Sequence, residues 1–214
     1  MPFDMDFTDV KVVLKSIATN SKKALDRMTD SYNNFLTLDP ADAKQVYLNS
    51  GRKSMAGGSY ESAVKTYRKL LELDPTNIEA LSELGRAYIK LGLLGDAVEL
   101  FEKARAIDRT SAQICFYLGS AYFMEDKNSE ALKAFKEAIK LDGGYTEAYY
   151  KLGLVYDSMQ DHDKAIDAYK KVIALNPDFI KAYQSLGLAY EGKGQRDEAI
   201  KWFKKALEKE EKGI

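Results

Sequence analysis

Small and hydrophobic residues recur along most of this chain at a constant interval of 34 positions. The interval is marked by five glycines, Gly51, Gly85, Gly119, Gly153 and Gly187, with no insertion between one unit and the next. Twelve residues after each glycine stands an alanine, and four residues later an aromatic ring. A fixed period of this length is typical of proteins built from stacked structural repeats.

Within each unit the hydrophobic positions have the period of an α-helix and form two separate stripes. In the fourth unit the first stripe contains Leu152, Gly153 and Tyr156, and the second contains Ala165 and Tyr169. Each unit is therefore predicted to be two amphipathic helices. The glycine and the alanine lack bulk, so we expect the two backbones to cross there with the aromatic ring beside them.

The residues between the stripes predict the turns. Three glycines stand where the first helix of a unit needs a left-handed residue at its end: Gly58, Gly92 and Gly194. Three polar residues stand where the second helix needs an N-cap: Ser129, Asp163 and Asp197.

Two helices in every 34 residues, with these marks, resemble the tetratricopeptide repeat over residues 44–211, in five units. The resemblance implies an all-α fold, a right-handed superhelix (α-solenoid) of tandem helix-turn-helix units. It further implies that the first helices line a concave groove and that the second helices form the convex side. Such proteins bind other proteins and do not catalyse reactions, so the chain is not expected to be an enzyme.

We expect three parts along the chain. Residues 1–43 lack the glycine and alanine marks and predict a degenerate N-terminal half-repeat or a docking arm. Residues 44–111 hold the first two units, and residues 112–214 hold the other three with a C-terminal cap. In the last unit Lys209 stands where the earlier units have leucine or isoleucine, so a solvated end is expected there.

The N-terminal residues carry apolar side chains at helical spacing. Those assigned to self-association are Leu14, Ile17, Leu25, Met28, Tyr32 and Phe35. Two interpretations stay open: a cap that packs on the first full unit, or an arm that docks into a neighbouring molecule. The second contact is head-to-tail, so it would generate rings or filaments.

The composition narrows the kinds of partner. Lys and Arg number 32 against 33 Asp and Glu, and the resulting net charge of −1 supplies no field to hold nucleic acid or anionic lipid. No 18-residue apolar stretch is present, and Asp4, Asp6 and Asp9 stand where a secretory signal is basic and then apolar. The single Cys115 cannot form an internal disulfide. A cytoplasmic protein without a cofactor is therefore expected.

The single histidine is the first candidate for chemistry, but its position favours a turn. His162 lies between Asp161 and Asp163, where the other units carry tyrosine, leucine, asparagine or arginine. Three adjacent residues cannot easily direct three donors at one ion, and no second histidine is present. Cys115 takes a packing position with no base pattern beside it. No catalytic residue and no metal ligand is predicted.

Binding surfaces remain, and the positions that face the groove in this family are read off the repeat. They are Arg52, Arg86, Phe116, Ser120, Phe123, Met124, Tyr150, Leu154, Asp157, Leu188 and Glu191. The groove is expected to be basic first, aromatic and apolar at its centre, and acidic last. Its centre suits an apolar anchor from a peptide or helix. The open alternative is that Phe116 and Phe123 are partly covered by adjacent helices.

The segments CFYLGSAYFMEDK and KAYQSLGLAYEGKGQRDEAIKWFKKALEKEEK resemble the tetratricopeptide proteins associated with the magnetosomes of magnetotactic bacteria. The resemblance implies a self-assembling scaffold on the cytoplasmic face of the magnetosome membrane, attached through other proteins. It also implies that the N-terminal arm of one copy docks in the concave groove of the next, and that the chain pivots between its second and third units. Two alternatives stay open: a monomeric adaptor that binds an extended peptide or helix in its groove, and a repeat module attached to an enzyme subunit such as a transferase.

Overall fold

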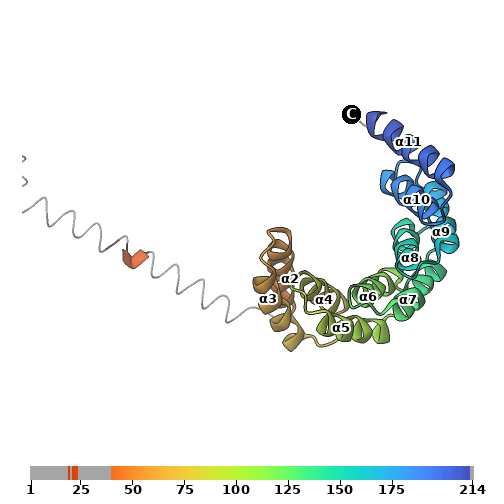
Figure 1. Cartoon of the computed structure of the whole chain (residues 1–214). Coiled ribbons are helices and arrows are strands. Elements are labelled where there is room, and N and C mark those ends of the chain that lie inside the picture. The colour runs from red at the N-terminus through yellow and green to blue at the C-terminus, as the bar shows by residue number, and fades with distance from the viewer. Residues whose placement is uncertain (1–18, 20, 24–39, 213–214) are drawn as a thin grey trace, which may run out of the picture. The chain divides into compact units, whose positions relative to one another are not determined.

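The computed structural model describes residue 19, residues 21–23 and residues 40–212, and outside short turns these residues are α-helical (Figure 1). The helices are α2 (Pro40–Ala56), α3 (Tyr60–Leu73), α4 (Ile78–Lys90), α5 (Leu94–Ile107), α6 (Ala112–Met124), α7 (Asn128–Leu141), α8 (Thr146–Ser158), α9 (His162–Leu175), α10 (Ile180–Gly192) and α11 (Arg196–Lys212). No strand occurs in this described part of the chain, and the prediction of an all-α fold is confirmed.

The chain divides into two compact units, residues 1–47 and residues 48–214, and each is described by itself. In the first unit the described residues are 19, 21–23 and 40–47, the last of which begin α2. The second unit contains the rest of α2 and the helices from α3 to α11. The predicted division at residue 111, with its pivot, stays a prediction.

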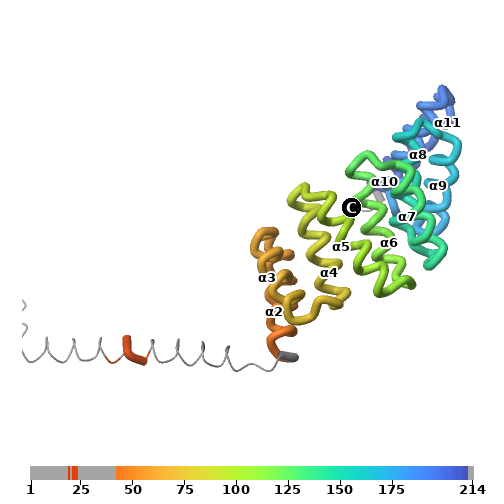
Figure 2. The backbone as a smooth tube through the Cα atoms, turned by 90° about the horizontal axis from the view of Figure 1, so that it is seen from below, coloured from red at the N-terminus to blue at the C-terminus, as the bar shows by residue number. Residues whose placement is uncertain are grey.

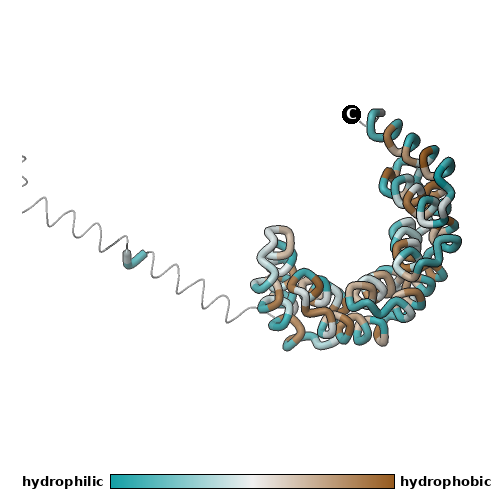
Figure 3. The backbone as a smooth tube through the Cα atoms, in the orientation of Figure 1, coloured by the Kyte–Doolittle hydropathy of each residue, from teal (hydrophilic) through white to brown (hydrophobic). Residues whose placement is uncertain are grey.

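In residues 48–214 the helices follow one another in chain order along a curved row (Figures 1 and 2). Helices α4, α6, α8 and α10 lie on the inner side of the curve, and α5, α7 and α9 lie on its outer side. Each helix packs on the one before it and the one after it. Hydrophobic residues recur along all of these helices (Figure 3), because every helix buries one face against each neighbour.

The two helices of a unit cross where the sequence placed its small residues. A Cβ added to Gly85 would lie 2.7 Å from Cζ of Phe101, and one added to Gly119 would lie 2.8 Å from Cδ1 of Phe135. Both rings are fully buried, as is Ala97 beside the first crossing. The glycines are therefore needed because the ring of the second helix rests directly on the backbone of the first.

The turn inside each unit is shorter than predicted. Gly58, Gly92 and Gly194 have φ of +71°, +76° and +76°, which confirms the left-handed end of the first helix. The second helix then begins two residues later, so Asp163 lies in the first turn of α9 and Asp161 is the N-cap, accepting from the Lys164 N–H at 3.3 Å. The prediction of N-caps was wrong for the same reason at the two other sites, Ser129 and Asp197, which lie inside α7 and α11.

Gln160 occupies the left-handed turn position of the fourth unit with φ of +60°. A side chain with a Cβ is strained there, whereas glycine is not. We expect Gln160→Gly to raise the free energy of unfolding by about 0.5–1 kcal/mol, measured by urea unfolding. Gln160→Ala is the control, because alanine keeps the Cβ. An equal gain in both variants would show that the backbone strain is not the cause.

Candidate protein-binding groove

The first part of the expected groove, on α2 and α4, holds two arginines that are already paired. Nε of Arg52 lies 2.8 Å from Oε1 of Glu79, and Nη1 of Arg86 lies 2.5 Å from Oε1 of Glu83. The Arg86 guanidinium also lies 5.4 Å from the centroid of the Tyr117 ring. This part of the groove is therefore less basic than its arginines alone suggest, because both glutamates come from α4. An acidic partner would have to compete with the exposed Arg52–Glu79 pair and the part-buried Arg86–Glu83 pair.

The aromatic centre of the groove is partly filled by the protein itself. The ring of Phe116 on α6 lies 5.1 Å from that of Tyr145 and 5.8 Å from that of Phe135, centroid to centroid. Met124 is 52% exposed, so it is the most open of the central residues. The uncharged groove residues that are half-buried are Phe116, Ser120, Phe123, Tyr150 and Leu154. A partner would therefore meet only part of each of these side chains.

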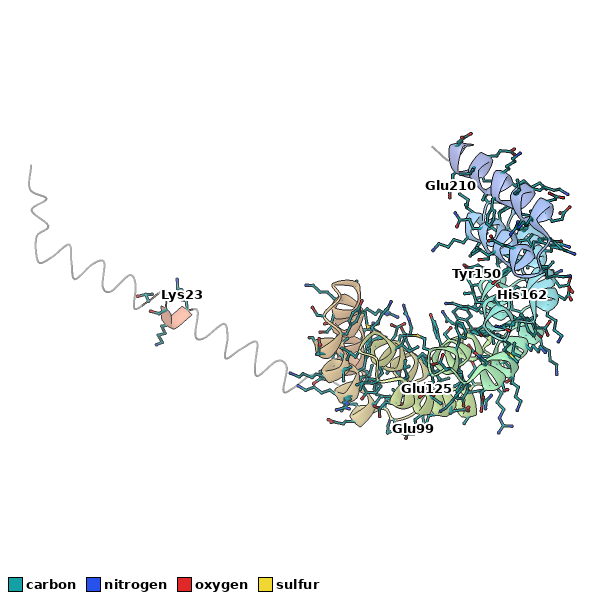
Figure 4. The ribbon with its side chains drawn as sticks, in the orientation of Figure 1. Lys23, Glu99, Glu125, Tyr150, His162 and Glu210 are labelled. Atoms are coloured by element: carbon teal, nitrogen blue, oxygen red, sulfur yellow. The ribbon has the colours of Figure 1, made fainter. Side chains whose placement is uncertain are left out.

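The last part of the groove, on α8 and α10, combines a buried contact with an open one. The Tyr150 ring lies 5.0 Å from that of Phe179, and its hydroxyl lies 3.4 Å from Oγ of Ser185. Figure 4 places Tyr150 on the inner side of the curve formed by residues 48–214. Leu188 is 58% exposed and Glu191 is also exposed. Leu188 is thus the most accessible apolar side chain among the expected groove residues.

Asp157 is held by its own unit, which the sequence did not reveal. The Tyr169 hydroxyl donates to Oδ2 of Asp157 at 2.7 Å, and Nδ1 of His162 lies 3.3 Å from Oδ1. Burial, followed by this contact with a carboxylate, holds the pKa of Tyr169 well above its usual range, so the hydroxyl stays a donor. A Cβ added to Gly192 would lie 2.7 Å from Cε1 of His162. His162, the first residue of α9, therefore packs against α10 and contacts Asp157 of α8 from one side.

Three further findings bear on the expected sites. Over residues 40–212 and the few described before them, no three His, Cys, Asp or Glu side chains are grouped so as to hold a metal ion. In the same part of the chain no helix is long and apolar enough to cross a membrane. The residues expected to mediate self-association lie outside the described part: Leu14, Ile17, Leu25, Met28, Tyr32 and Phe35.

Cys115 is 1% exposed, and burial, with a smaller effect of Glu137, raises the pKa of its thiol to about 11. We expect a thiol reagent to label the folded protein very slowly at pH 8, because the thiolate is the reactive form. Labelling in denaturant should be fast. Rapid labelling of the folded chain would contradict the burial.

The raised pKa of the Cys115 thiol also means that the free energy of unfolding falls as the pH rises from 9 toward about 11, because only the unfolded thiol loses its proton in that range.

Comparison with known proteins places these features in a family. Profiles described as tetratricopeptide repeat match residues 80–113, 146–179 and 180–210, and one described as TPR repeat matches residues 51–92 and 125–160. A crystal structure of MamA protein is 52% identical, covers 80% of this chain and 94% of its own, and superposes with a TM-score of 0.72. A second crystal structure of MamA is 55% identical over 76% of this chain and 95% of its own, with a TM-score of 0.71.

A curated relative outside that group shares only part of the array. The BBSome complex member BBS4 of Bos taurus is 32% identical over 71 residues, which are 33% of this chain. The match spans 13% of the length of that relative. The similarity to this relative is therefore limited to repeat units.

Proposed function

The chain belongs to the tetratricopeptide repeat proteins and, among them, to the MamA family, and we propose that it is a self-assembling scaffold of the magnetosome. In this proposal it lies on the cytoplasmic face of the magnetosome membrane, is attached there through other proteins, and recruits further proteins through its repeat surfaces. The observation that carries the proposal is identity of 52% with a MamA crystal structure over 80% of this chain. Stacked helix pairs with half-exposed apolar residues on the inner side support the binding role.

The attachment is tested by fractionation of a magnetotactic cell that produces the tagged chain. A scaffold held by protein contacts should sediment with isolated magnetosomes and be released by alkaline carbonate without detergent. Retention until detergent is added would argue for direct insertion, and absence from the magnetosome fraction would contradict the proposal.

Self-assembly is proposed to require the N-terminal residues, whose apolar side chains recur at helical spacing. We expect the full chain to form large oligomers and a chain without residues 1–41 to be monomeric. Multi-angle light scattering measures both masses, and circular dichroism checks that the truncated chain keeps its helices. Oligomers of unchanged size after truncation would end this part of the proposal.

The surface that receives the N-terminal arm is, by family resemblance, the concave groove. Leu188 is the most exposed apolar residue among those expected to face the groove, so Leu188→Glu tests the groove without disturbing the core. A loss of assembly in this variant supports the groove as receiving surface.

A monomeric adaptor is the second candidate function, and the exposure of Met124 on the third repeat and of Leu188 on the fifth favours it. In that case one extended peptide or helix binds per chain, with an apolar anchor near Phe116. Phe116→Ala and Phe123→Ala should then weaken binding by about tenfold each, measured by calorimetry with the captured partner. Higher stoichiometry, or oligomers of the chain alone, would exclude this function.

A further inference from the structure

A hollow of about 270 Å³ lies between α8 and α9 of the fourth unit. We call it the outer hollow, and its lining includes Tyr149, Tyr156, Lys164, Asp167, Ala168 and Lys171. Leu154, which was expected to face the groove, follows Tyr149 by five residues, and five residues are about 140° around a helix. The outer hollow is therefore on a different face of α8 from the groove, so a partner in one does not block the other.

The fifth unit shows what fits beside Tyr149. Trp202 stands at the repeat position of Ala168, and Tyr183 stands at that of Tyr149. The Trp202 ring lies 6.2 Å from the Tyr183 ring, centroid to centroid, at an interplanar angle of 45°. Ala168 has no ring, and the outer hollow lies between it and Tyr149. An aromatic side chain from another molecule can therefore take the place that Trp202 takes in the fifth unit.

Three lysine ammonium groups lie over the tyrosine rings of the outer hollow. Nζ of Lys136 on α7 lies 5.6 Å from the centroid of the Tyr156 ring, and Nζ of Lys164 on α9 lies 5.5 Å from it. Nζ of Lys171 lies 6.0 Å from the centroid of the Tyr149 ring. Neither Lys136 nor Lys171 forms an ion pair with another described residue. Two ammonium groups are therefore available to carboxylates of a partner.

Lys164 makes the outer hollow more basic than the same place in the other units. Its repeat position is occupied there by Ser62, Asp96, Glu130 and Glu198. Lys164 is paired with Asp161, the N-cap of its own helix, and Asp167 is the carboxylate in the lining. The site thus has more ammonium groups than carboxylates, and it attracts a negatively charged group.

We propose that the outer hollow binds an aromatic side chain, flanked by aspartate or glutamate, from an acidic segment of a partner protein. The aromatic ring packs against Tyr149 over Ala168, and the flanking carboxylates pair with Lys136 and Lys171. The inference rests on the proposed recruitment of other proteins, and it names one receiving surface and the chemistry of its partner. An anionic lipid headgroup fits less well, because it pairs with the lysines but leaves the space beside Tyr149 without a ring.

The test titrates the full-length chain into a fluorescein-labelled peptide, Gly-Glu-Asp-Trp-Asp-Glu-Gly, and measures fluorescence anisotropy. One control peptide has alanine in place of tryptophan, and another has amides in place of all its carboxylates. We expect each control to bind at least about tenfold more weakly than the acidic peptide. Equal affinities of the three peptides would overturn the inference.

Variants of the protein locate the binding site. Lys171→Glu should weaken binding of the acidic peptide at least about tenfold, because it reverses a charge at the outer hollow. Lys205→Glu is the matched control, since it changes an exposed lysine at the same repeat position of the fifth unit and should have no effect. Lys164→Glu gives the fourth unit the residue of the third and fifth, so its fold should be kept while binding is weakened. Ala168→Trp should abolish binding, because its ring occupies the space that the partner needs.

The remaining outcomes separate this inference from the proposed function. Equal affinities of Lys171→Glu and Lys205→Glu, with equal melting temperatures, would place the peptide elsewhere and overturn the inference. Phosphatidylglycerol vesicles that bind in place of the peptide, and require Lys171, would assign the outer hollow to a membrane and also overturn it. No binding of the acidic peptide at about 1 mM would overturn it and leave the proposed function standing. Absence of the tagged chain from the magnetosome fraction contradicts the proposed function whatever the peptide does.

Discussion

Replacement of Gly119 by leucine is expected to lower the free energy of unfolding by at least about 3 kcal/mol. A Cβ at this position would already lie 2.8 Å from both Cδ1 and Cε1 of Phe135. The ring is fully buried between α6 and α7, so it has no free space into which it can move. Leucine adds further carbons beyond the Cβ, and the two helices must separate to admit them. Urea unfolding followed by circular dichroism measures the loss.

The same substitution at Gly143 is the matched control. Gly143 is exposed in the turn after α7, and a Cβ built there meets nothing within 4 Å. Gly143→Leu should therefore change the free energy of unfolding by less than about 0.5 kcal/mol. Similar losses in the two variants would mean that the glycine of the repeat is not required by the ring beneath it.

Phe135→Ala is the second large effect, with an expected loss of about 3–5 kcal/mol. The ring is fully buried and is the surface on which the backbone at Gly119 rests, so its removal leaves a cavity between the paired helices. Phe116→Ala removes the same atoms from a half-buried site in the groove, and we expect at most about half of that loss. The comparison separates packing inside a unit from packing at the groove.

Hydrogen exchange shows where each of these losses acts. Each helix contacts mainly its neighbours in the row, so stability is nearly a sum of units and the junctions between them. Faster exchange in Phe135→Ala should be concentrated in α6, α7 and α8, with α3 and α11 little changed. A uniform increase along the chain would mean that residues 48–214 unfold as one cooperative block.

The repeat pattern predicted the helices and their pairing, but not which polar groups on them have a partner. Arg52 and Arg86 were expected to make the groove basic, but they are paired with Glu79 and Glu83. Asp157 was expected to make it acidic, but the Tyr169 hydroxyl donates to its carboxylate. The N-caps were misplaced because the left-handed turn is short, so the second helix begins before the polar residues that were expected to cap it.

The sequence by itself determined the all-α fold, the unit length and the crossing point of each helix pair. These depend on helical spacing and on the bulk of single residues, which any unit of the array specifies alone. Only the tertiary structure decided which side chains contact a partner within the chain and which are exposed to solvent. Arg52 and Glu79 are 27 residues apart, and Ile200 on α11 is 52% exposed whereas Ile166, at the same position of the repeat on α9, is 5% exposed. Whether a side chain is paired or covered depends on its neighbours in space. A repeating pattern is the same whether such a neighbour is present or absent.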